Sequence, residues 1–271
     1  GRALAAGVAM VAVGTQRDTS AAAVDLAEKY EGVFACVGLH PIHTSRSFHD
    51  REELGGSGGE FTSRGEEFDH EYYKKLASHP KVVAIGECGL DYYRHDANRR
   101  TAGASGGDDV NVKKQVEAFK RQIELAVEVK KPLMLHLRNG PGRSAYRDAF
   151  SIIDSCFKLD TSYPRGNLHF FAGSIEEVKP FLDLGFSFSF TGVITFARNY
   201  DEIIRYLPPE RIMSETDCPY VAPAPYRGRR NEPLYVREVA RMIAEIRGAD
   251  FGKIRAALLD NAVRFFGFNF R

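Results

Sequence analysis

Hydrophobic residues occur along this chain in short unbroken blocks, without the polar alternation of a strand that has one solvated face. Seven such blocks predict strands, and they begin near Val8, Val33, Val82, Leu133, Asn167, Phe186 and Arg211. Blocks that are apolar on both faces are typical of parallel strands covered by helices on each side. The pattern therefore predicts a sheet that is buried on both faces.

Between these blocks, apolar residues recur every three or four positions, which indicates amphipathic helices. The clearest case is segment 111–131, where Val116, Phe119 and Ile123 share one face. Strands that alternate with helices predict right-handed βαβ units. The predicted class is α/β, a parallel (β/α)8 barrel of the TIM type with seven strands expected here. The chain opens on the tail of a helix and lacks an initial Met, so we expect the first strand of the barrel to be missing.

The length and composition favour one domain. A chain of 271 residues with 44% hydrophobic content fits a single α/β barrel, so residues 1–271 are assigned to one hydrolase domain. Two glycine-containing polar stretches, 50–68 and 96–110, have no apolar period. Strands resume after each of them with the same spacing, so both are predicted to be flexible surface insertions.

The charge and cysteine content exclude several classes of protein. The 37 Lys and Arg residues nearly balance the 36 Asp and Glu residues, so no global basic field is present and a polyanion would have to be held locally. The four cysteines form no CxxC pair, which favours reduced thiols and a cytoplasmic location. The apolar runs fall short of the ~20 residues that span a bilayer, and the apolar start lacks the pattern of a signal peptide.

Candidate chemistry gathers at the ends of the predicted strands. Each of five strands ends on or near one residue of a set, namely His40, Glu87, His136, His169 and Asp217. In a barrel these ends meet at one mouth. A single histidine on a strand is more often a core residue, but five such residues at five strand ends favour a metal site. Imidazole and carboxylate ligands suit Zn, Mn or Fe, and carboxylate-rich sites accept Mg.

Glu87 is the centre of this set. It follows the buried block 82–86, where an unpaired carboxylate would be prohibitively costly, so it requires a partner or a metal ion. A bridging carboxylate at this position can hold two ions about 3.5–4 Å apart, which is the arrangement that clamps both oxygens of a phosphoester displacement.

Six segments add a family resemblance to this pattern. They are 38–41 (GLHP), 86–93 (GECGLDYY), 136–138 (HLR), 169–173 (HFFAG), 215–220 (ETDCPY) and 229–233 (RRNEP). In order and over nearly the whole chain, they resemble the signature blocks of the TatD family of metal-dependent deoxyribonucleases, which are amidohydrolase-like barrels. The resemblance implies that Glu87 bridges two divalent ions, that His136 and His169 bind one of them, and that Asp217 binds the other and helps to activate water.

The resemblance also implies two divalent ions, Mg, Mn or Zn, as cofactors, and makes Glu87 and Asp217 the expected catalytic residues. Members of the family begin with a strand that ends in His-x-His and completes one metal position, and this sequence has no such strand. We therefore expect the metal position on the side of Asp217, which this pair completes, to be weakly occupied or empty, with reduced stability of the barrel.

Substrate contacts are expected from cations and rings near the mouth. Arg138 and Arg227, the latter with Arg229 and Arg230 in one loop, are placed to bind phosphate, although a solvated surface patch is an equal alternative for the loop. His40 is expected either to contact the phosphate or to orient a ligand. Tyr92, with its neighbour Tyr93, is expected to stack on a base or to pack at the rim. Asn231 is interpreted as a helix cap.

The expected function is hydrolysis of phosphodiester bonds in DNA by metal-activated water, acting as an exonuclease on single strands or strand ends. Two alternatives stay open, because fold and metal do not determine the substrate. One is a barrel metallohydrolase for a small-molecule ester, amide or phosphate. The other is a truncated remnant that has lost turnover.

Overall fold

The structure is a computed structural model that describes residues 1–46, 48–49, 61–62, 64–93, 108–157 and 165–268. The predicted insertions at 50–68 and 96–110 lie mostly outside the described residues. A short antiparallel pair, β3 (Phe48–His49) and β4 (Phe61–Thr62), lies beside the first of them.

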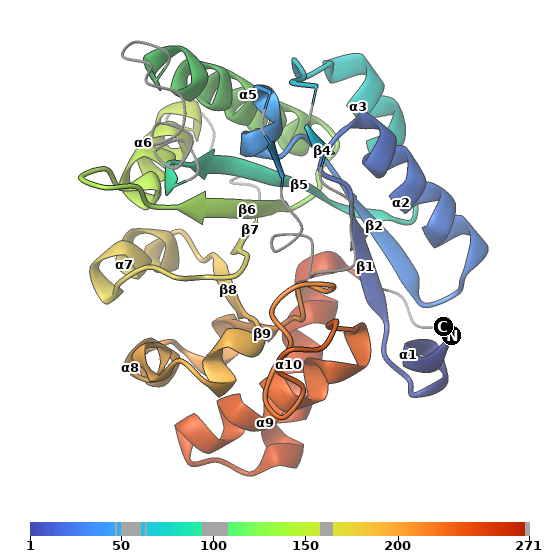
Figure 1. The fold of residues 1–271 in the computed structure, drawn as a ribbon, viewed down its shortest axis with the longest axis vertical. Helices are drawn as coiled ribbons and strands as arrows, with labels where there is room; N and C mark the ends of the chain where they lie inside the picture. The colour runs from blue at the N-terminus through green and yellow to red at the C-terminus, as the bar shows by residue number, and fades with distance from the viewer. Residues whose placement is uncertain (47, 50–60, 63, 94–107, 158–164, 269–271) are drawn as a thin grey trace.

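Seven parallel strands make one sheet, in the order β1-β2-β5-β6-β7-β8-β9. Their bounds are β1 (Met10–Val13), β2 (Val33–Val37), β5 (Val82–Asp91), β6 (Leu133–Arg138), β7 (Gly166–Leu168), β8 (Ser187–Phe190) and β9 (Ile212–Ser214). Every neighbouring pair is parallel, and the sheet curls into a half-barrel (Figure 1). The predicted α/β class and the seven expected strands are confirmed.

Helices alternate with the strands and lie outside the curled sheet (Figure 1). They are α1 (Arg2–Ala5), α2 (Arg17–Lys29), α3 (His70–Ala77), α5 (Asp108–Glu128), α6 (Ala145–Phe157), α7 (Ile175–Asp183), α8 (Asp201–Tyr206), α9 (Val236–Arg247) and α10 (Phe251–Phe266). One cluster of buried apolar side chains includes residues from nearly all of these elements. This continuity supports the proposal of a single domain.

Strand β5 is the rigid support of the candidate site. All of its residues are buried, and Ile85 and Leu90 are fully inaccessible. Burying each such side chain contributes roughly 1.5–3 kcal/mol. The strand therefore carries Glu87 and Asp91 in fixed positions.

Two glycines let β5 approach β6 closely. Gly86 and Gly89 have φ angles of 152° and 136°, in a region that side chains disfavour. A Cβ at Gly89 would lie 2.3 Å from the carbonyl oxygen of His136. The pairing register with β6 shifts between Ile85 and Cys88, as in the bulges that re-aim side chains beside active sites. Glu87 is the side chain carried by this irregular stretch.

Candidate metal centre

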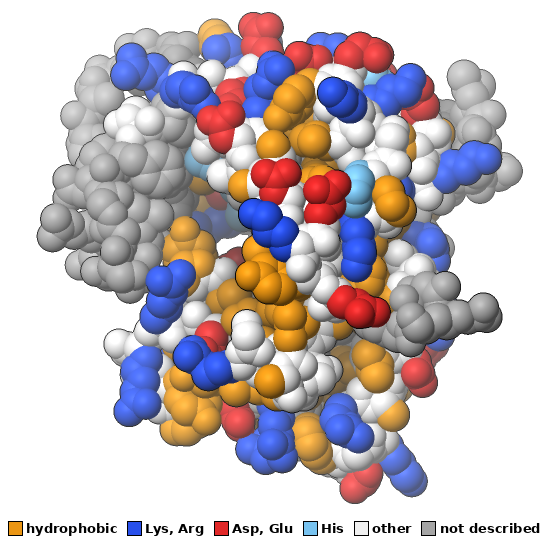
Figure 2. Space-filling view, turned by 90° about the vertical axis from the view of Figure 1, so that its right-hand side faces the viewer, with side chains coloured by type: hydrophobic (Ala, Val, Ile, Leu, Met, Phe, Trp, Pro, Cys, Tyr) orange, Lys and Arg blue, Asp and Glu red, His pale blue; other side chains and the backbone are white. Residues whose placement is uncertain are grey.

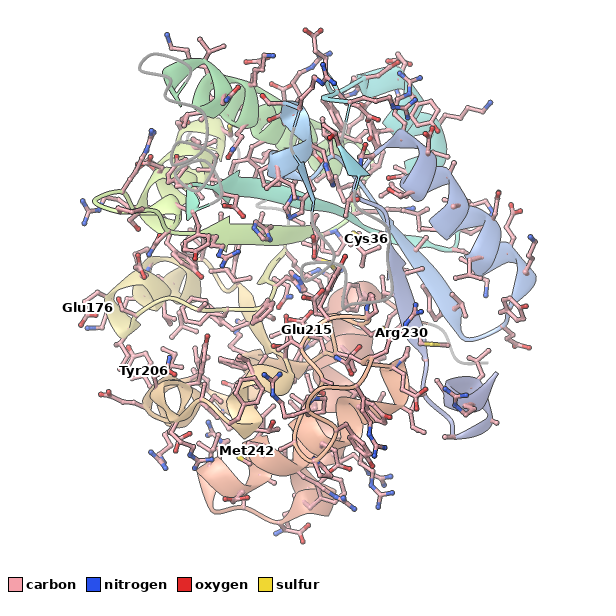
Figure 3. All side chains as sticks on the ribbon, viewed as in Figure 1. Cys36, Glu176, Tyr206, Glu215, Arg230 and Met242 are labelled. Carbon is pink, nitrogen blue, oxygen red and sulfur yellow. The ribbon has the colours of Figure 1, made fainter. Side chains whose placement is uncertain are left out.

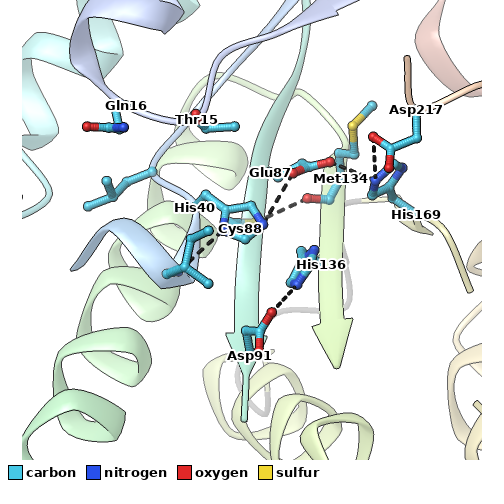
Figure 4. A network of polar contacts seen from close by, with 12 residues as sticks. Thr15, Gln16, His40, Glu87, Cys88, Asp91, Met134, His136, His169 and Asp217 are labelled. Carbon is cyan, nitrogen blue, oxygen red and sulfur yellow. Dashed lines mark hydrogen bonds and ion pairs between the residues drawn. The ribbon is translucent and has the colours of Figure 1, made fainter. Parts of the chain in front are cut away.

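The five residues singled out at the strand ends converge in the structure (Figure 4). Glu87 belongs to β5 and His136 to β6, whereas the other three follow the ends of β2, β7 and β9. Ligand atoms from these residues form two groups, in each of which all atoms lie within 4.8 Å of one another. The groups are His40 with Glu87 and His136, and Glu87 with His169 and Asp217. Glu87 is common to both.

Direct contacts of Glu87 explain why this buried carboxylate is tolerated. Its residue is 9% exposed, and its Oε1 lies 2.7 Å from Nε2 of His169. Its other oxygen, Oε2, lies 3.4 Å from Nε2 of His40. Burial opposes the ionisation of Glu87, but His169, and then His40 and His136, outweigh it and hold its pKa below the usual range. The carboxylate is therefore charged and ready to bind a cation.

His169 is held between two carboxylates. Its Nδ1 hydrogen-bonds to Oε2 of Glu215, and its Nε2 faces Glu87. Burial opposes protonation of the ring, but Glu215 and Glu87 outweigh it and raise the pKa of His169 well above its usual range. A proton on this ring thus occupies the place where a cation would balance the same carboxylates.

Asp217 completes the second group. Its Oδ1 lies 3.9 Å from Nε2 of His169, and its side chain is 27% exposed. Burial, followed by the nearby carboxylates of Glu87 and Glu215, raises the pKa of Asp217 to about 7, although His169 opposes the rise. Asp217 adopts a positive φ of 52°, in the loop after β9. It is the cluster carboxylate that solvent reaches best.

His40 has a defined tautomer. The backbone N–H of Ile42 donates to its Nδ1 at 3.2 Å, so the ring proton belongs on Nε2, which faces Glu87. Burial and the neighbouring His136 hold the pKa of His40 well below its usual range, which keeps the ring neutral. This geometry favours His40 as a hydrogen-bond donor that orients Glu87, one of the two roles expected for it.

Two carboxylates of the site were missed by sequence reasoning. Asp91 is 1% exposed, and its Oδ2 lies 2.9 Å from Nε2 of His136. Glu215 accepts from the backbone N–H of Phe170 at 2.7 Å and also contacts His169. Each orients a histidine from behind, as the outer partners of metal-binding histidines do. The sequence could have identified both residues, because Asp91 and Glu215 lie in the family motifs 86–93 and 215–220.

The resemblance implies that His136 and His169 share one ion. Ligand atoms of the described residues form one group with His136 and His40 and another with His169 and Asp217, and Glu87 belongs to both. Nε2 of His136 contacts Asp91, whereas His169 contacts Glu215 and Glu87. Which histidines bind the same ion stays a prediction.

The donor set suits a divalent cation. The buried imidazoles and carboxylates compensate their charges through shared protons, a role that a cation can take over. Glu87 belongs to both groups of candidate ligands. With its Nε2 engaged by Asp91, the Nδ1 lone pair of His136 remains for a ligand. Nitrogen and carboxylate donors in this mixture accept Zn or Mn, and also Mg.

The expected substrate residues lie at the same end of the sheet. Arg138 is the exposed last residue of β6, and Arg227 is exposed in the loop after β9. Tyr92 is 3% exposed, and its hydroxyl donates to Asp148 at 2.8 Å. It packs at the rim, and its neighbour Tyr93, 51% exposed, has the accessible ring.

The interpretation of Asn231 as a helix cap is wrong. The short helix η5 (Pro233–Tyr235) has Glu232 as its N-cap, with no side-chain cap bond. Asn231 is 2% exposed, and its Nδ2 donates to the carbonyl oxygens of Thr216 and Tyr220, at 2.7 and 2.6 Å. It therefore fastens the loop that carries Asp217.

Comparison with known proteins agrees with this geometry. The family model described as TatD related DNase matches residues 2–267, almost the whole chain. This chain belongs to the TatD family. It is 34% identical over 262 residues to the uncharacterized metal-dependent hydrolase YabD of Bacillus subtilis (strain 168), covering 96% of this chain and 88% of YabD. The resemblance to TatD deoxyribonucleases is thus confirmed, and the chain is a metal-dependent hydrolase of this family.

Two further TatD proteins extend the comparison. The chain is 31% identical over 274 residues to the 3'-5' ssDNA/RNA exonuclease TatD of Citrobacter rodentium (strain ICC168), covering 98% of this chain and 89% of that protein. The crystal structure of YJJV, a TatD homolog from Escherichia coli K12, superposes with a TM-score of 0.73 at 25% identity, covering 99% of this chain and 90% of YJJV. Among the residues described here, no helix is long and apolar enough to cross a membrane.

Proposed function

We propose that this TatD hydrolase cleaves phosphodiester bonds of single-stranded DNA from a strand end. The observation that carries the proposal is Glu87, one carboxylate shared by two groups of metal-binding side chains, at the end of the sheet where Arg138 and Arg227 are exposed. A relative with 31% identity is named a 3'-5' ssDNA/RNA exonuclease, which supports the substrate class.

Divalent ions, up to two of Mg, Mn or Zn, would be held by Glu87 and His136 on one side and by Glu87, His169 and Asp217 on the other. Bound there, such ions polarise phosphate oxygens and lower the pKa of water. Asp91 and Glu215 keep the two histidines oriented, and His40 holds Glu87 through its Nε2–H. These residues fix the ligand atoms before substrate arrives.

Asp217 is the proposed proton acceptor. Its side chain is 27% exposed, against 11% for Glu87, so water reaches its oxygens more readily. A carboxylate within reach of the attacking water takes its proton as the bond from the water oxygen to phosphorus forms. The bond from phosphorus to the leaving sugar oxygen breaks, and that oxygen takes up a proton from solvent. Arg138 and Arg227 are proposed to hold the phosphate, because a guanidinium matches two of its oxygens at once.

The charge distribution supports action on a strand end. The formal net charge is +1, and on the face shown in Figure 2 Lys and Arg side chains are interspersed with Asp and Glu. Non-specific wrapping of nucleic acid depends on an extended basic surface. A short local contact at the mouth fits a chain terminus better.

The test uses linear and circular single-stranded DNA of one sequence with added Mg or Mn. We expect the linear form to be degraded progressively and the circular form to persist, and Glu87→Gln to abolish cleavage. The matched control is Glu176→Gln on α7, whose side chain lies at the outer edge of the molecule, far from Glu215 (Figure 3). Equal rates on both forms would refute the exonuclease, and an inert wild type would favour a small-molecule substrate.

A further inference from the structure

We propose that two exposed aromatic rings, Tyr93 and Phe196, are stacking platforms for the bases of a single-stranded nucleic acid, each acting with the arginine packed on it. The inference rests on the proposed function and adds which side chains bind that substrate. The site would then bind the bases of the strand as well as its phosphates.

The two arginine–aromatic pairs have the same separation. The guanidinium carbon of Arg138 lies 3.9 Å from the ring centroid of Tyr93, and that of Arg227 lies 3.9 Å from the ring centroid of Phe196. Contacts at this distance are cation–π interactions, which limit the motion of the guanidinium. The N–H groups of each guanidinium are proposed to bind an incoming phosphate.

Both rings are unusually exposed for their position. Tyr93 is 51% and Phe196 is 41% exposed, although Tyr93 comes soon after the buried strand that carries Glu87 and Asp91, and Phe196 follows a segment with the buried residues Gly192 and Ile194. Tyr93 follows β5, and Phe196 ends the short helix η2 (Gly192–Thr195) after β8. Both therefore lie at the carboxyl end of the sheet, on the side of the metal-binding cluster. Exposing the apolar surface of a ring to water is unfavourable in free energy, and a base stacked on the ring would cover part of that surface.

The guanidinium groups are available for an anion. Within the described ranges, neither Arg138 nor Arg227 forms an ion pair with a carboxylate; Arg227 donates only to the carbonyl oxygen of Ala222, at 3.3 Å. Other exposed arginines of the protein do have acidic partners, such as Arg198 with Asp201. A phosphate would therefore not have to displace an internal counter-ion at either pair.

The loop that carries Phe196 is fastened to the loop that carries Arg227. The backbone N–H of Ala224 donates to Oγ1 of Thr195 at 2.8 Å, and a Cβ at Gly192 would lie 2.6 Å from the carbonyl oxygen of Val221. The pair is thus built on two segments that cannot separate easily. A pre-ordered ring and cation lose less entropy on binding than mobile ones.

The two pairs lie at the same end of the sheet. Tyr93 and Arg138 belong to the ends of the neighbouring strands β5 and β6, whereas Phe196 and Arg227 lie in the segments after the neighbouring strands β8 and β9. One strand that passes the metal-binding cluster would then meet a ring and a cation from each pair.

Alternating cations and flat rings are the features with which proteins bind single strands, since every base has a π face and every nucleotide a phosphate. A protein partner would need a larger continuous apolar patch than two separated rings. The occupant that fits is therefore single-stranded nucleic acid.

The test is equilibrium binding of a fluorescein-labelled, phosphorothioate-linked oligothymidylate, which resists cleavage, to the full chain with Mn present. Phe196→Ala and Tyr93→Ala should each weaken binding by about 5- to 150-fold, the effect of losing one stacked base. An abasic oligomer of the same length should bind all variants within about twofold of the wild type. Phe196→Trp should retain the affinity for the oligothymidylate.

Tyr206→Ala is the matched control. Tyr206 is 43% exposed, a fraction similar to that of Phe196. It is the last residue of α8 and lies on the outer side of the molecule (Figure 3). Its replacement should change neither the affinity for the oligothymidylate nor that for the abasic oligomer. Arg227→Gln should lower the slope of log affinity against log salt by about 0.7, the value for one phosphate contact with a single strand, whereas Phe196→Ala should leave the slope unchanged.

The outcomes separate this inference from the proposed function. Base-dependent binding that is lost in Phe196→Ala supports the platforms even if the wild type cleaves no DNA, in which case only the proposed reaction fails. If the wild type does cleave DNA, but Phe196→Ala and Tyr93→Ala bind both oligomers as it does, the platforms are refuted. Equal losses in Tyr206→Ala, or on the abasic oligomer, also refute them.

Discussion

At the scale of single residues, the most informative group is the carboxylate of Asp91. It is 1% exposed and 2.9 Å from Nε2 of His136, so it fixes which nitrogen of that ring carries the proton. Asp91→Asn keeps an acceptor of the same shape but loses the charge. We expect it to weaken binding of Mn or Zn by about 10- to 100-fold, measured by titration against a competing chelator.

Asp148→Asn is the control for Asp91. Asp148 accepts from Tyr92 and Arg143, and neither of these is a proposed metal ligand. Its replacement should leave metal affinity unchanged. A purely structural role for Asp91 would appear as a lower unfolding midpoint at unaltered metal affinity, and that result would contradict the prediction.

Gly89 supplies a second prediction at this scale. Its φ of 136° and the 2.3 Å separation between a Cβ and the carbonyl oxygen of His136 leave no room for a side chain. Gly89→Ala should lower the free energy of unfolding by about 2–4 kcal/mol, through backbone strain and displacement of β6. Denaturant unfolding measures it.

Gly142 separates strain from steric overlap. It also has a positive φ, 73°, but a Cβ there would meet nothing within 4 Å. Gly142→Ala should therefore cost only about 1–2 kcal/mol. Similar costs for the two variants would show that β5 and β6 can move apart, against the description of β5 as a rigid support.

The sequence predicted the types of side chain in the cluster better than their partners. The five predicted residues lie at or near strand ends, and the carboxyl ends of barrel strands meet at one face irrespective of side-chain orientation. They are His40, Glu87, His136, His169 and Asp217. Which histidine faces which carboxylate depends on ring orientation, and no spacing encodes it. The sequence did hold a clue, since Asp91 and Glu215 lie in the same short motifs as Glu87 and Asp217.

At the scale of elements, the loop after β9 determines where Asp217 lies. Asn231 binds the carbonyl oxygens of Thr216 and Tyr220, on either side of that residue. Asn231→Ala removes the Nδ2 donor from the carbonyl oxygens of Thr216 and Tyr220, and from that of Val221 at 3.4 Å. Each lost hydrogen bond costs about 0.5–1.5 kcal/mol. We expect lower stability together with weaker metal binding, measured by unfolding and by metal titration on the same sample.

Asn261 offers a matched comparison. It is buried on α10, and its Nδ2 donates to the carbonyl oxygens of Pro209 and Ile212, at 2.7 and 2.8 Å, near the start of β9. Asn261→Ala should reduce stability by a similar amount but leave metal affinity intact. If both variants lose metal affinity equally, the effect is global unfolding, and Asn231 has no special link to the site.

Strand boundaries show where sequence reasoning about elements stops. The described part of the chain has the seven parallel strands that the sequence predicts, but the apolar pattern predicts strands over 167–171 and 211–216, which are longer than those observed. β7 ends at Leu168 and β9 at Ser214. Phe170 and Asp217 have φ angles of 45° and 52°, which no strand can accommodate. Hydrogen bonds of Glu215 and Asn231 with these loops favour such conformations, and those bonds exist only after folding.

At the scale of the whole molecule, the metal-binding cluster joins distant parts of the chain. Residues from β5 and β6 meet residues that follow β2, β7 and β9, so one site spans most of the sheet. A ligand that binds only this assembled arrangement must stabilise the fold as a whole. The cluster is therefore a stabilising device as well as a proposed catalytic one.

A measurable consequence is thermal stabilisation by metal. At an ion concentration of about 100 times the dissociation constant, the gain is about 2.7 kcal/mol, which raises the midpoint of a chain of this size by about 5–10 °C. Glu87→Gln should remove most of this increment, because it deprives both groups of their shared ligand, whereas Glu176→Gln should retain it.

The pH dependence of this increment follows from the protons that the cluster holds. Glu215 and Glu87 raise the pKa of His169 well above its usual range, and a cation must displace that proton in order to bind the ring. Metal binding therefore releases protons, so the thermal increment should shrink as the pH is lowered and grow as it is raised. Differential scanning calorimetry with and without Mn over a pH series measures it. An increment that does not change with pH would mean that the stabilising ion binds without displacing a proton, and thus away from His169.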